Sequence, residues 1–537
     1  MTRTLLATLA LSLAACSSAD IPADSGVFSP VDLQRGLLTR AEATDFEETS
    51  SYEDIVDFLA TMDGLSDQIY TTTFGTSVEG RDLPLAIWSA SRADSTAEAV
   101  RQSGKTRVLV FANIHAGEVA GKEAALMLLR DLANGAHAEW ADSLVVMIAP
   151  IYNADGNERV AYGNRPRQWG PVGGMGQRPN AQGLDLNRDF MKLASPEARA
   201  LVGLIRDADP HVVVDLHTTN GTHMGYHLTY APPLSPATPV AIDKHLREEW
   251  LPHLSAEILR THDMATEHYG NVPGAFGENA SSVPRGWYSF SGQPRFSTNY
   301  TGIRGRYGLL SEAYSYASFE DRVTVSKRFV EEVLAAAYRD ASRVRATTAE
   351  ADRQSVVGQE LAVRAGFTAP NSTREILLGA VDTLRHPETG DRMYARRDVR
   401  TPETMPVYSR FGAVETERVP AGYLVPARLA EVTDLLAAHG IRTTDVPEGL
   451  ALEEFQVDSV RVASRPFQNV RQQEAFGRWA PRNDAAPTSG VYVPMDQPLA
   501  RLAFLLLEPR SDDSVVNWAL VSLEDRGSYP ILRAPAP

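Results

Sequence analysis

The sequence predicts an α/β fold in which a mostly parallel or mixed sheet is covered by helices on both faces and is followed by a smaller mixed or β-rich domain. Continuous apolar runs alternate with helical patterns over about residues 50–345. Such runs are typical of strands buried on both faces, and their alternation with helices indicates a mostly parallel sheet. After about residue 354 the chain breaks into short runs between Gly, Pro and Asp, which indicates a separate domain.

Four short, continuously apolar runs are the predicted strands of this sheet. A short run without polar interruptions is typical of a strand that is buried on both faces. They lie at residues 107–114, 143–151, 211–216 and 307–311.

Helices are predicted between and after these strands. Residues 119–132 carry apolar side chains at helical spacing. Ser195 and Pro196 combine a capping hydroxyl with a proline at the first helical position, so a helix is expected to begin there. Further helices are predicted at about 238–268 with a kink near Pro252, at 321–342, and at 429–439 with Gly440 as its stop.

A chain of 537 residues is long enough for two or three domains. The accessory domain at its C-terminal end is expected to pack against the α/β unit, to restrict a cleft, or to bind cell wall or glycan, and the sequence does not distinguish these roles. The expected divisions are a signal segment at 1–16, a tether at 17–45, the α/β unit at 46–346, a polar linker at 347–354 and the accessory domain at 355–537.

The composition is that of a globular protein, with 43% hydrophobic and 22% charged residues. The net charge of −16 argues against a nucleic-acid partner, because phosphate binding needs a basic surface. It also fits a plain acidic, solvated surface. The oligomeric state is not predicted.

The N-terminus has the features of an export signal. Arg3 precedes an apolar run at residues 5–13, which is much shorter than the ~20 residues of a membrane-spanning helix. The following Leu13-Ala-Ala-Cys16 resembles the bacterial lipobox, and Cys16 is the only cysteine of the chain. The resemblance implies a lipid on Cys16 that anchors the exported protein in the bacterial cell envelope, in the periplasm or outer membrane. The alternative is a plain signal peptide with a chance cysteine.

Polar residues follow the ends of all four predicted strands. His115 and Glu118 follow the first, Asn153 and Asp155 the second, His217 the third, and a glutamate at position 312 the fourth. Ligands bind at the carboxyl ends of strands in open parallel sheets, so these groups are expected to meet.

Two histidines and one glutamate form a hydrolytic zinc shell that leaves a fourth position for water. His115, Glu118 and His217 supply this set for one Zn²⁺ per chain, with Glu312 as the general base. The H-x-x-E spacing alone is weak, because His245 and Glu248 repeat it within a predicted helix, where we expect a solvated face.

Six segments, in order, resemble the zinc carboxypeptidases of the pancreatic carboxypeptidase A type over a little more than half of the chain. The resemblance implies a carboxypeptidase-like catalytic domain at 46–346, the zinc ligands and base named above, and a peptide as substrate. The segments are Gly75–Arg81, His115–Glu118, Pro150–Gly156, Gly183–Phe190, Asp215–His217 and Leu309–Glu312.

The resemblance also implies the groups that hold the substrate. Asn187 and Arg188 would grip the terminal carboxylate, since an Arg–carboxylate fork is bidentate and charge-assisted. Arg178, or else Arg167, would polarise the scissile carbonyl. Tyr288 or Tyr300 would cap the substrate, and the two are not distinguished.

The sequence departs from the pattern at Thr219, where digestive members of the family carry an aromatic residue. His223 and His227 would line the cleft or bind a second metal, although surface or core positions explain them as well. Three arginines before Glu312 are a candidate reader of an acidic side chain, or basic loop charges only. They are Arg295, Arg304 and Arg306.

The expected function is hydrolysis of C-terminal peptide bonds in the periplasm or at the cell surface. One alternative is a zinc amidohydrolase of the aspartoacylase type that acts on small acyl amino acids. Another is a non-catalytic binding protein on the same scaffold, which the complete set of ligands and base argues against.

Overall fold

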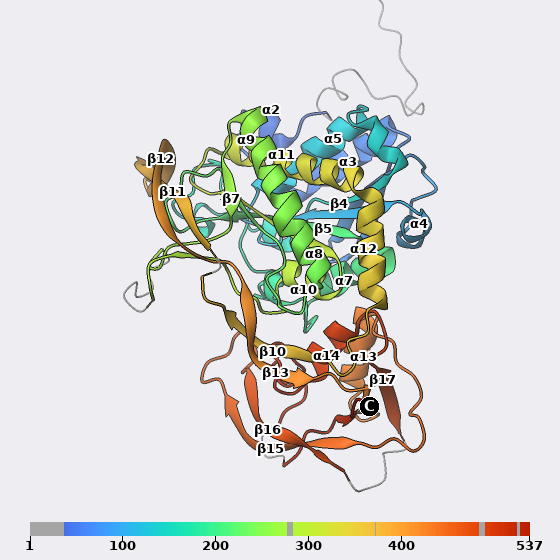
Figure 1. Ribbon diagram of the computed structural model, residues 1–537. Coiled ribbons are helices and arrows are strands. Elements are labelled where there is room, and N and C mark those ends of the chain that lie inside the picture. The colour runs from blue at the N-terminus through green and yellow to red at the C-terminus, as the bar shows by residue number, and fades with distance from the viewer. Residues whose placement is uncertain (1–36, 276–282, 371, 483–488, 524–526) are drawn as a thin grey trace, which may run out of the picture.

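A computed structural model of the protein describes residues 37–275, 283–370, 372–482, 489–523 and 527–537 (Figure 1). The predicted signal segment, Cys16 and most of the tether lie outside these residues. The central sheet has the strand order β1-β2-β4-β3-β5-β9-β6-β7, and the inner strands β4, β3, β5 and β9 run parallel. The bounds are β1 (Ile69–Thr76), β2 (Asp82–Trp88), β3 (Thr106–Ala112), β4 (Leu144–Ala149), β5 (Val212–Thr219), β6 (Leu228–Ala231), β7 (Thr266–His268) and β9 (Tyr307–Tyr314).

Helices cover both faces of this sheet, which confirms the predicted fold class. Side chains alternate along a strand, so Val108 and Val110 of β3 face one side while Leu109 and Phe111 face the other. The first side packs against α3 (Tyr52–Leu65), α5 (Ala120–Ala133), α9 (Leu251–His262), α11 (Phe319–Arg339) and α12 (Ala341–Arg353). The second packs against α4 (Ala97–Gln102), α7 (Pro196–Ala208) and α10 (Ser297–Ile303).

The predicted strands agree with β3, β4, β5 and β9, and α7 begins as expected. The Ser195 hydroxyl accepts a hydrogen bond from the Ala198 N–H at 3.1 Å, a cap that contributes about 1 kcal/mol. The long helical stretch predicted at 238–268 is shorter. It runs through α8 (Val240–Lys244), a π-helical turn (His245–Trp250) and α9, and it ends where Asp263 adopts a φ of 53°.

The polar linker predicted at 347–354 is helical instead, because it forms the end of α12. Val344 and Thr348 are buried on one side of this helix, and the Thr348 hydroxyl donates to the Val344 carbonyl at 3.0 Å. A helix with so narrow a buried stripe is polar in composition, so its sequence resembles a linker.

The C-terminal part is β-rich, as predicted, and adds three smaller sheets and two helices to the described residues. Its strands β11 and β12 form a long hairpin that reaches back along the α/β unit (Figure 1). Val407 of β12 lies opposite Trp287 of β8 in a parallel pair. The remaining bounds are β8 (Trp287–Tyr288), β10 (Glu360–Phe367), β11 (Ser372–Arg385), β12 (Arg392–Tyr408), β13 (Phe411–Arg418), β14 (Gly422–Pro426), α13 (Ala430–His439), β15 (Glu453–Val462), β16 (Gln473–Pro481), β17 (Gly490–Pro494), α14 (Ala500–Leu507) and β18 (Leu532–Ala534).

One hydrophobic core runs through both parts. Leu201 of α7 and Ile303 of α10 belong to the same buried cluster as Leu435 of α13 and Phe504 of α14. The C-terminal helices therefore cover the α7 and α10 side of the α/β unit, which leaves the carboxyl ends of the inner strands for the site.

His439, the last residue of α13, joins the two parts by hydrogen bonds. Its Nδ1 accepts from the Tyr300 hydroxyl at 2.9 Å, and its Nε2 donates to the Met191 carbonyl at 3.1 Å. Burial lowers the pKa of His439 to about 3. A histidine of the unfolded chain has a pKa of ~6.5. Between this pH and pH about 3, the unfolded chain therefore binds a proton at His439 and the folded protein does not.

This difference predicts that the free energy of unfolding falls as the pH drops below about 6.5, by up to ~1.4 kcal/mol per pH unit from this residue. His439→Gln replaces the ring by an amide that has one acceptor and donor hydrogens but cannot titrate, so the stability of this variant should depend less steeply on pH. Urea unfolding at pH 7.5, 6 and 5 measures the slopes. His253→Gln, at an exposed position, should keep the wild-type slope, and a wild-type slope in His439→Gln would contradict the assignment.

Candidate metal-dependent active site

The metal-capable side chains lie at the carboxyl ends of β3, β5 and β9. His115 and Glu118 lie in the turn after β3, His217 lies in β5, and Glu312 lies opposite His217 in the neighbouring strand β9. From β3 the chain passes to β4 on one side and then returns to β5 on the other. The ends of β3 and β5 therefore flank a topological switch point, where open α/β sheets bind their ligands.

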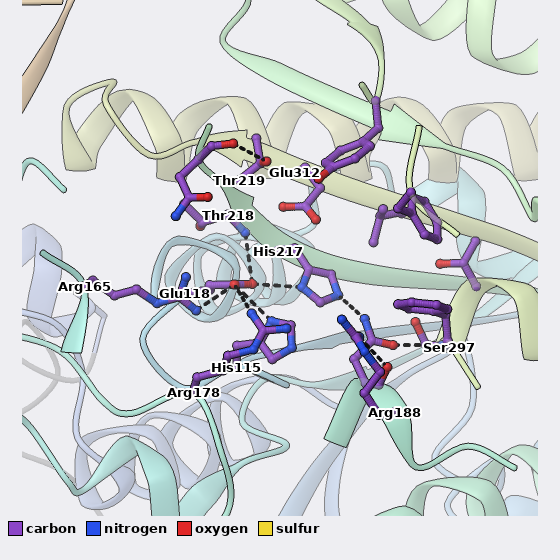
Figure 2. Close-up of a pocket in the computed structure, with 17 residues that line it drawn as sticks. His115, Glu118, Arg165, Arg178, Arg188, His217, Thr218, Thr219, Ser297 and Glu312 are labelled. Atoms are coloured by element: carbon purple, nitrogen blue, oxygen red, sulfur yellow. Dashed lines mark hydrogen bonds and ion pairs between the residues drawn. The ribbon is translucent and has the colours of Figure 1, made fainter. Parts of the chain in front are cut away.

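His115, Glu118 and His217 form a compact, buried cluster (Figure 2). One ligand atom of each lies within 4.8 Å of the others. The Glu118 carboxylate lies between the two rings, 3.0 Å from Nδ1 of His115 and 2.8 Å from Nδ1 of His217. Two imidazole nitrogens and a carboxylate directed at one point match the donor set of a catalytic zinc site with an open fourth position.

A carboxylate lies behind each histidine ring. Oδ1 of Asp185 is 3.0 Å from Nε2 of His115, and Oδ2 of Asp215 is 2.8 Å from Nε2 of His217. Such pairs place the proton on Nε2 and leave Nδ1 free for a metal. Burial opposes the charge of Asp185, but His115 and Arg178 hold its pKa well below the usual range. The carboxylate is therefore ionised at every physiological pH.

Glu312 of β9 faces the cluster and lies close to His217 of the neighbouring strand β5 (Figure 2). It is partly buried, and its carboxylate makes no hydrogen bond or ion pair with another described residue. Burial raises the pKa of Glu312 to about 8; His217 opposes this effect, while Glu118 and Asp215 add to it. An unpaired carboxyl group with a raised pKa beside a metal cluster is suited to take up and release a proton.

These groups open onto a pocket of about 320 Å³. Its cationic wall carries three guanidinium groups, and aromatic rings and hydroxyl groups form much of the rest. The lining residues are His115, Glu118, Arg165, Arg178, Asn187, Arg188, His217, Thr218, Thr219, Asn220, Tyr269, Phe290, Phe296, Ser297, Thr298, Leu310 and Glu312.

Asn187 and Arg188 lie together on one wall, in a short 3-10 helix (Leu186–Arg188). Oδ1 of Asn187 accepts from the Ser297 N–H at 3.0 Å, which fixes the amide. The Arg188 guanidinium lies over the Phe296 ring at 4.3 Å, and its ion pair with Asp185 is long, at 3.9 Å. Its Nη1 also donates to the Asn187 carbonyl at 2.8 Å, so the donors left for an anion in the pocket are those of Nε and Nη2.

Of the two arginines expected near the carbonyl, Arg178 lines the pocket and Arg167 does not. Arg178 is 2.8 Å from Oδ2 of Asp185 and 3.8 Å from Oε1 of Glu118. Arg167 instead lies over the Tyr394 ring at 5.9 Å, and its carbonyl accepts from the Tyr394 N–H at 2.8 Å. Its role is to join the loop before Arg178 to the β11–β12 hairpin.

Arg165 is a third pocket arginine that the sequence analysis did not identify. It donates to Oε1 of Glu118 at 2.7 Å. Its side chain fills the space beside Gly117, where an added Cβ would lie 2.8 Å from Nε of Arg165 and 2.6 Å from the Gly176 carbonyl. The close Gly176 carbonyl and the Arg165 side chain together leave no room for a Cβ at Gly117. No local pattern marks the pairing of Arg165 with Glu118, because 47 residues separate them.

Neither tyrosine expected to cap the substrate lines the pocket. Tyr300 is fully buried and bonded to His439, while Tyr288 stacks on Tyr408 at 4.2 Å. Tyr269, which follows β7, lines the pocket instead. A three-residue strand gives too short a pattern to identify from sequence, so this position was missed.

The three arginines considered as readers of an acidic side chain also lie outside the pocket. Arg295 pairs with Asp513 at 2.7 Å, Arg306 pairs with Asp209 at 2.8 Å, and Arg304 donates to the His439 carbonyl at 2.9 Å. These three arginines stabilise the fold and do not contact the pocket.

The other histidines are not ligands in the described residues. His223 packs against the Tyr316 and Tyr394 rings, and His227 is buried; neither lines the pocket. His245 of the second H-x-x-E is buried rather than solvated, and its Nδ1 lies 2.9 Å from the Tyr307 hydroxyl.

Comparison with known proteins agrees with this geometry. Residues 55–309 match the family model described as zinc carboxypeptidase. This part of the chain is therefore similar to the zinc carboxypeptidases. It carries the zinc cluster, Asn187 and Arg188, and the matched segment ends just before Glu312.

The chain is also similar to carboxypeptidase 2 of Trichophyton tonsurans, which is 25% identical over 475 residues that cover 85% of this chain and 81% of the relative. Carboxypeptidase E of Caenorhabditis elegans is 34% identical over 129 residues, which are 22% of this chain and 25% of the relative. A metallo-carboxypeptidase structure from Burkholderia cenocepacia is 19% identical with a TM-score of 0.39, and covers 54% of this chain and 70% of its own.

The cluster predicts one zinc per chain that depends on each ligand. His115→Ala should abolish zinc retention, because two remaining ligands do not hold the metal through dialysis. Metal content by mass spectrometry after dialysis measures this. His245→Gln is the matched control from the second H-x-x-E and should keep one zinc. One retained zinc in His115→Ala would show that the metal lies elsewhere.

Proposed function

We propose that the protein is a zinc-dependent carboxypeptidase that removes single residues from the free C-terminus of peptides. The observation that carries this proposal is the position of Asn187 and Arg188 in the same pocket as the zinc cluster and Glu312. A terminal carboxylate held on that wall places the last peptide bond near the cluster. An endopeptidase has no need of such a wall.

The zinc would be held by Nδ1 of His115, the carboxylate of Glu118 and Nδ1 of His217. When bound, zinc lowers the pKa of a coordinated water towards ~7 and polarises a carbonyl. The protein supplies ring orientation through Asp185 and Asp215, each in contact with an Nε2 atom. Because both histidines are tied from behind, the ligand geometry is set before the metal arrives.

Glu312 moves the proton. Its free carboxylate takes a proton from the attacking water and delivers it to the nitrogen of the departing residue, which leaves as an amine. The raised pKa fits this exchange, since a weakly acidic carboxyl group both accepts and releases a proton near neutral pH. A bound zinc would lower this pKa by its positive charge and so would favour the ionised form of Glu312 at the start of the reaction.

Two arginines bind the substrate and stabilise the charge that develops on it. Arg188 and the Asn187 amide bind the terminal carboxylate, and a charge-assisted fork of this kind is selective for a chain end. Arg178, already close to Glu118, donates to the oxygen of the scissile carbonyl as negative charge develops there.

Phe290, Phe296 and Leu310 form the apolar part of the pocket. Among the described residues, no charged side chain other than the groups assigned above lines the pocket, so an aromatic or aliphatic terminal side chain is the preferred substrate.

The proposal predicts that peptides with a free C-terminus are shortened one residue at a time and that their C-terminal amides are not, with apolar terminal residues removed fastest. A zinc chelator should stop the reaction. Glu312→Gln should keep its zinc and lose about 10²–10⁴-fold in kcat, because it cannot accept the proton. Mass spectrometry of timed digests and metal analysis of the variant are the measurements.

Equal cleavage of amides and free acids would exclude an exopeptidase. Hydrolysis of N-acyl amino acids alone would favour the small-amide hydrolase instead. A fully active Glu312→Gln would refute the assignment of the base.

We further propose that the enzyme is an exported lipoprotein anchored through Cys16 in a bacterial cell envelope. The position of the only cysteine directly after Leu13-Ala14-Ala15 supports this. The described helices include none that is long and apolar enough to cross a membrane, and a multiply acylated cysteine provides stable anchoring without one.

Anchoring predicts that the wild-type chain incorporates radiolabelled palmitate and sediments with membranes when it is expressed in a Gram-negative host. Cys16→Ser should lose the label, because the lipid is attached through the thiol. A labelled Cys16→Ser variant, or an unlabelled wild type, would contradict the proposal. A Ser17→Ala variant, which keeps the thiol, is the control and should stay labelled.

A further inference from the structure

A tight turn of the C-terminal part contacts the loop that bears the zinc site. Oε1 of Gln468 accepts a hydrogen bond from the Asp185 N–H at 2.8 Å, across 283 residues of sequence. Asp185 lies directly behind His115, at 3.0 Å from its Nε2, and also binds Arg178. Asp185 therefore connects Gln468 to the zinc ligand His115 and to Arg178, the arginine assigned to the carbonyl.

The backbone of this turn is unusual. Phe467 and Val470 exchange both backbone hydrogen bonds, at 2.8 and 3.0 Å, and enclose Gln468 and Asn469, whose φ angles are 51° and 63°. Two successive positive φ angles between paired residues are those of a type I′ turn, which favours Asn and Gly. Asn469 fits this preference and Gln468 does not. Residues held in a disfavoured backbone conformation cluster at functional sites.

The turn is fixed to the catalytic part by aromatic and ionic contacts. The Arg295 guanidinium lies over the Phe467 ring at 5.2 Å and over the Trp518 ring at 4.7 Å. Arg295 also pairs with buried Asp513 at 2.7 Å. Lys192, four residues after Arg188, lies over Trp518 at 4.8 Å. Gln468 therefore reaches Asp185 from a rigid support.

We infer that Gln468 is a positioning residue of the zinc site, through which the C-terminal part holds Asp185 against His115. The inference rests on the zinc site of the proposed function. The Asp185 carboxylate contacts Nε2 of His115, binds Arg178 and accepts a hydrogen bond from the Asn187 N–H at 3.0 Å. All three contacts depend on the position of the Asp185 backbone. The Gln468 amide fixes that position from the other side.

Gln468→Asn separates this role from simple folding. Asparagine suits a positive φ, so the turn should be as stable as in the wild type or more stable, but its side chain is one methylene shorter and does not reach the Asp185 N–H. Zinc should dissociate about 10-fold faster, in line with the loss of an outer partner of a ligand. The kcat should fall by a similar factor with little change in KM.

The readouts are zinc release to a chromogenic chelator, the thermal unfolding midpoint and, on a cleaved peptide, kcat and KM. Gln468→Glu keeps an acceptor oxygen at the same reach and should release zinc within about threefold of the wild-type rate. Asn469→Gly changes the neighbouring turn position without touching Asp185 and should release zinc at the wild-type rate.

Faster zinc release from Gln468→Asn at an unchanged or raised unfolding midpoint supports the inference. Wild-type zinc release from Gln468→Asn overturns it, and so does an equal effect in Asn469→Gly. Zinc release is measured without substrate. If the wild type cleaves no peptide, the proposed function fails while the role of Gln468 is still decided.

Discussion

The ionised carboxylate of Glu118, buried at the end of β3, is the constraint on which the rest of the site depends. A buried carboxylate costs several kcal/mol unless it is paired. Burial favours its protonation, but His115 and Arg165 hold the pKa of Glu118 well below the usual range. Its partners come from the same turn, from β5 and from a distant loop. The strand order β3-β5-β9 brings Glu118, the two histidines and Glu312 to one point, and the loop adds Arg165.

The parts that local sequence determines were predictable. The inner strands are continuous apolar runs, and His115, Glu118, His217 and Glu312 follow them at the position where a parallel sheet gathers its ligands. The start of α7 was predictable from Ser195 and Pro196 because a cap is a local interaction.

The parts that depend on distant contacts were not predictable. Arg165 and Tyr269 reach the pocket from loops whose course no periodicity describes. Arg304 and Arg306 looked like free charges near the site, yet each has a partner far along the chain, the His439 carbonyl for Arg304 and Asp209 for Arg306. The end of α12 looked like a linker because its buried stripe is narrow. In each case a contact between remote segments decides the role.

The core shared by α7, α10, α13 and α14 has an evolutionary consequence. The change in composition near residue 354 marks a boundary in the sequence, but the free energy of folding is not divided there. Substitutions under α13 alter the packing of Ile303 and the bonds of Tyr300 as directly as substitutions within the catalytic part. The two parts are therefore expected to accept mutations jointly, and neither is a module that recombination could exchange alone.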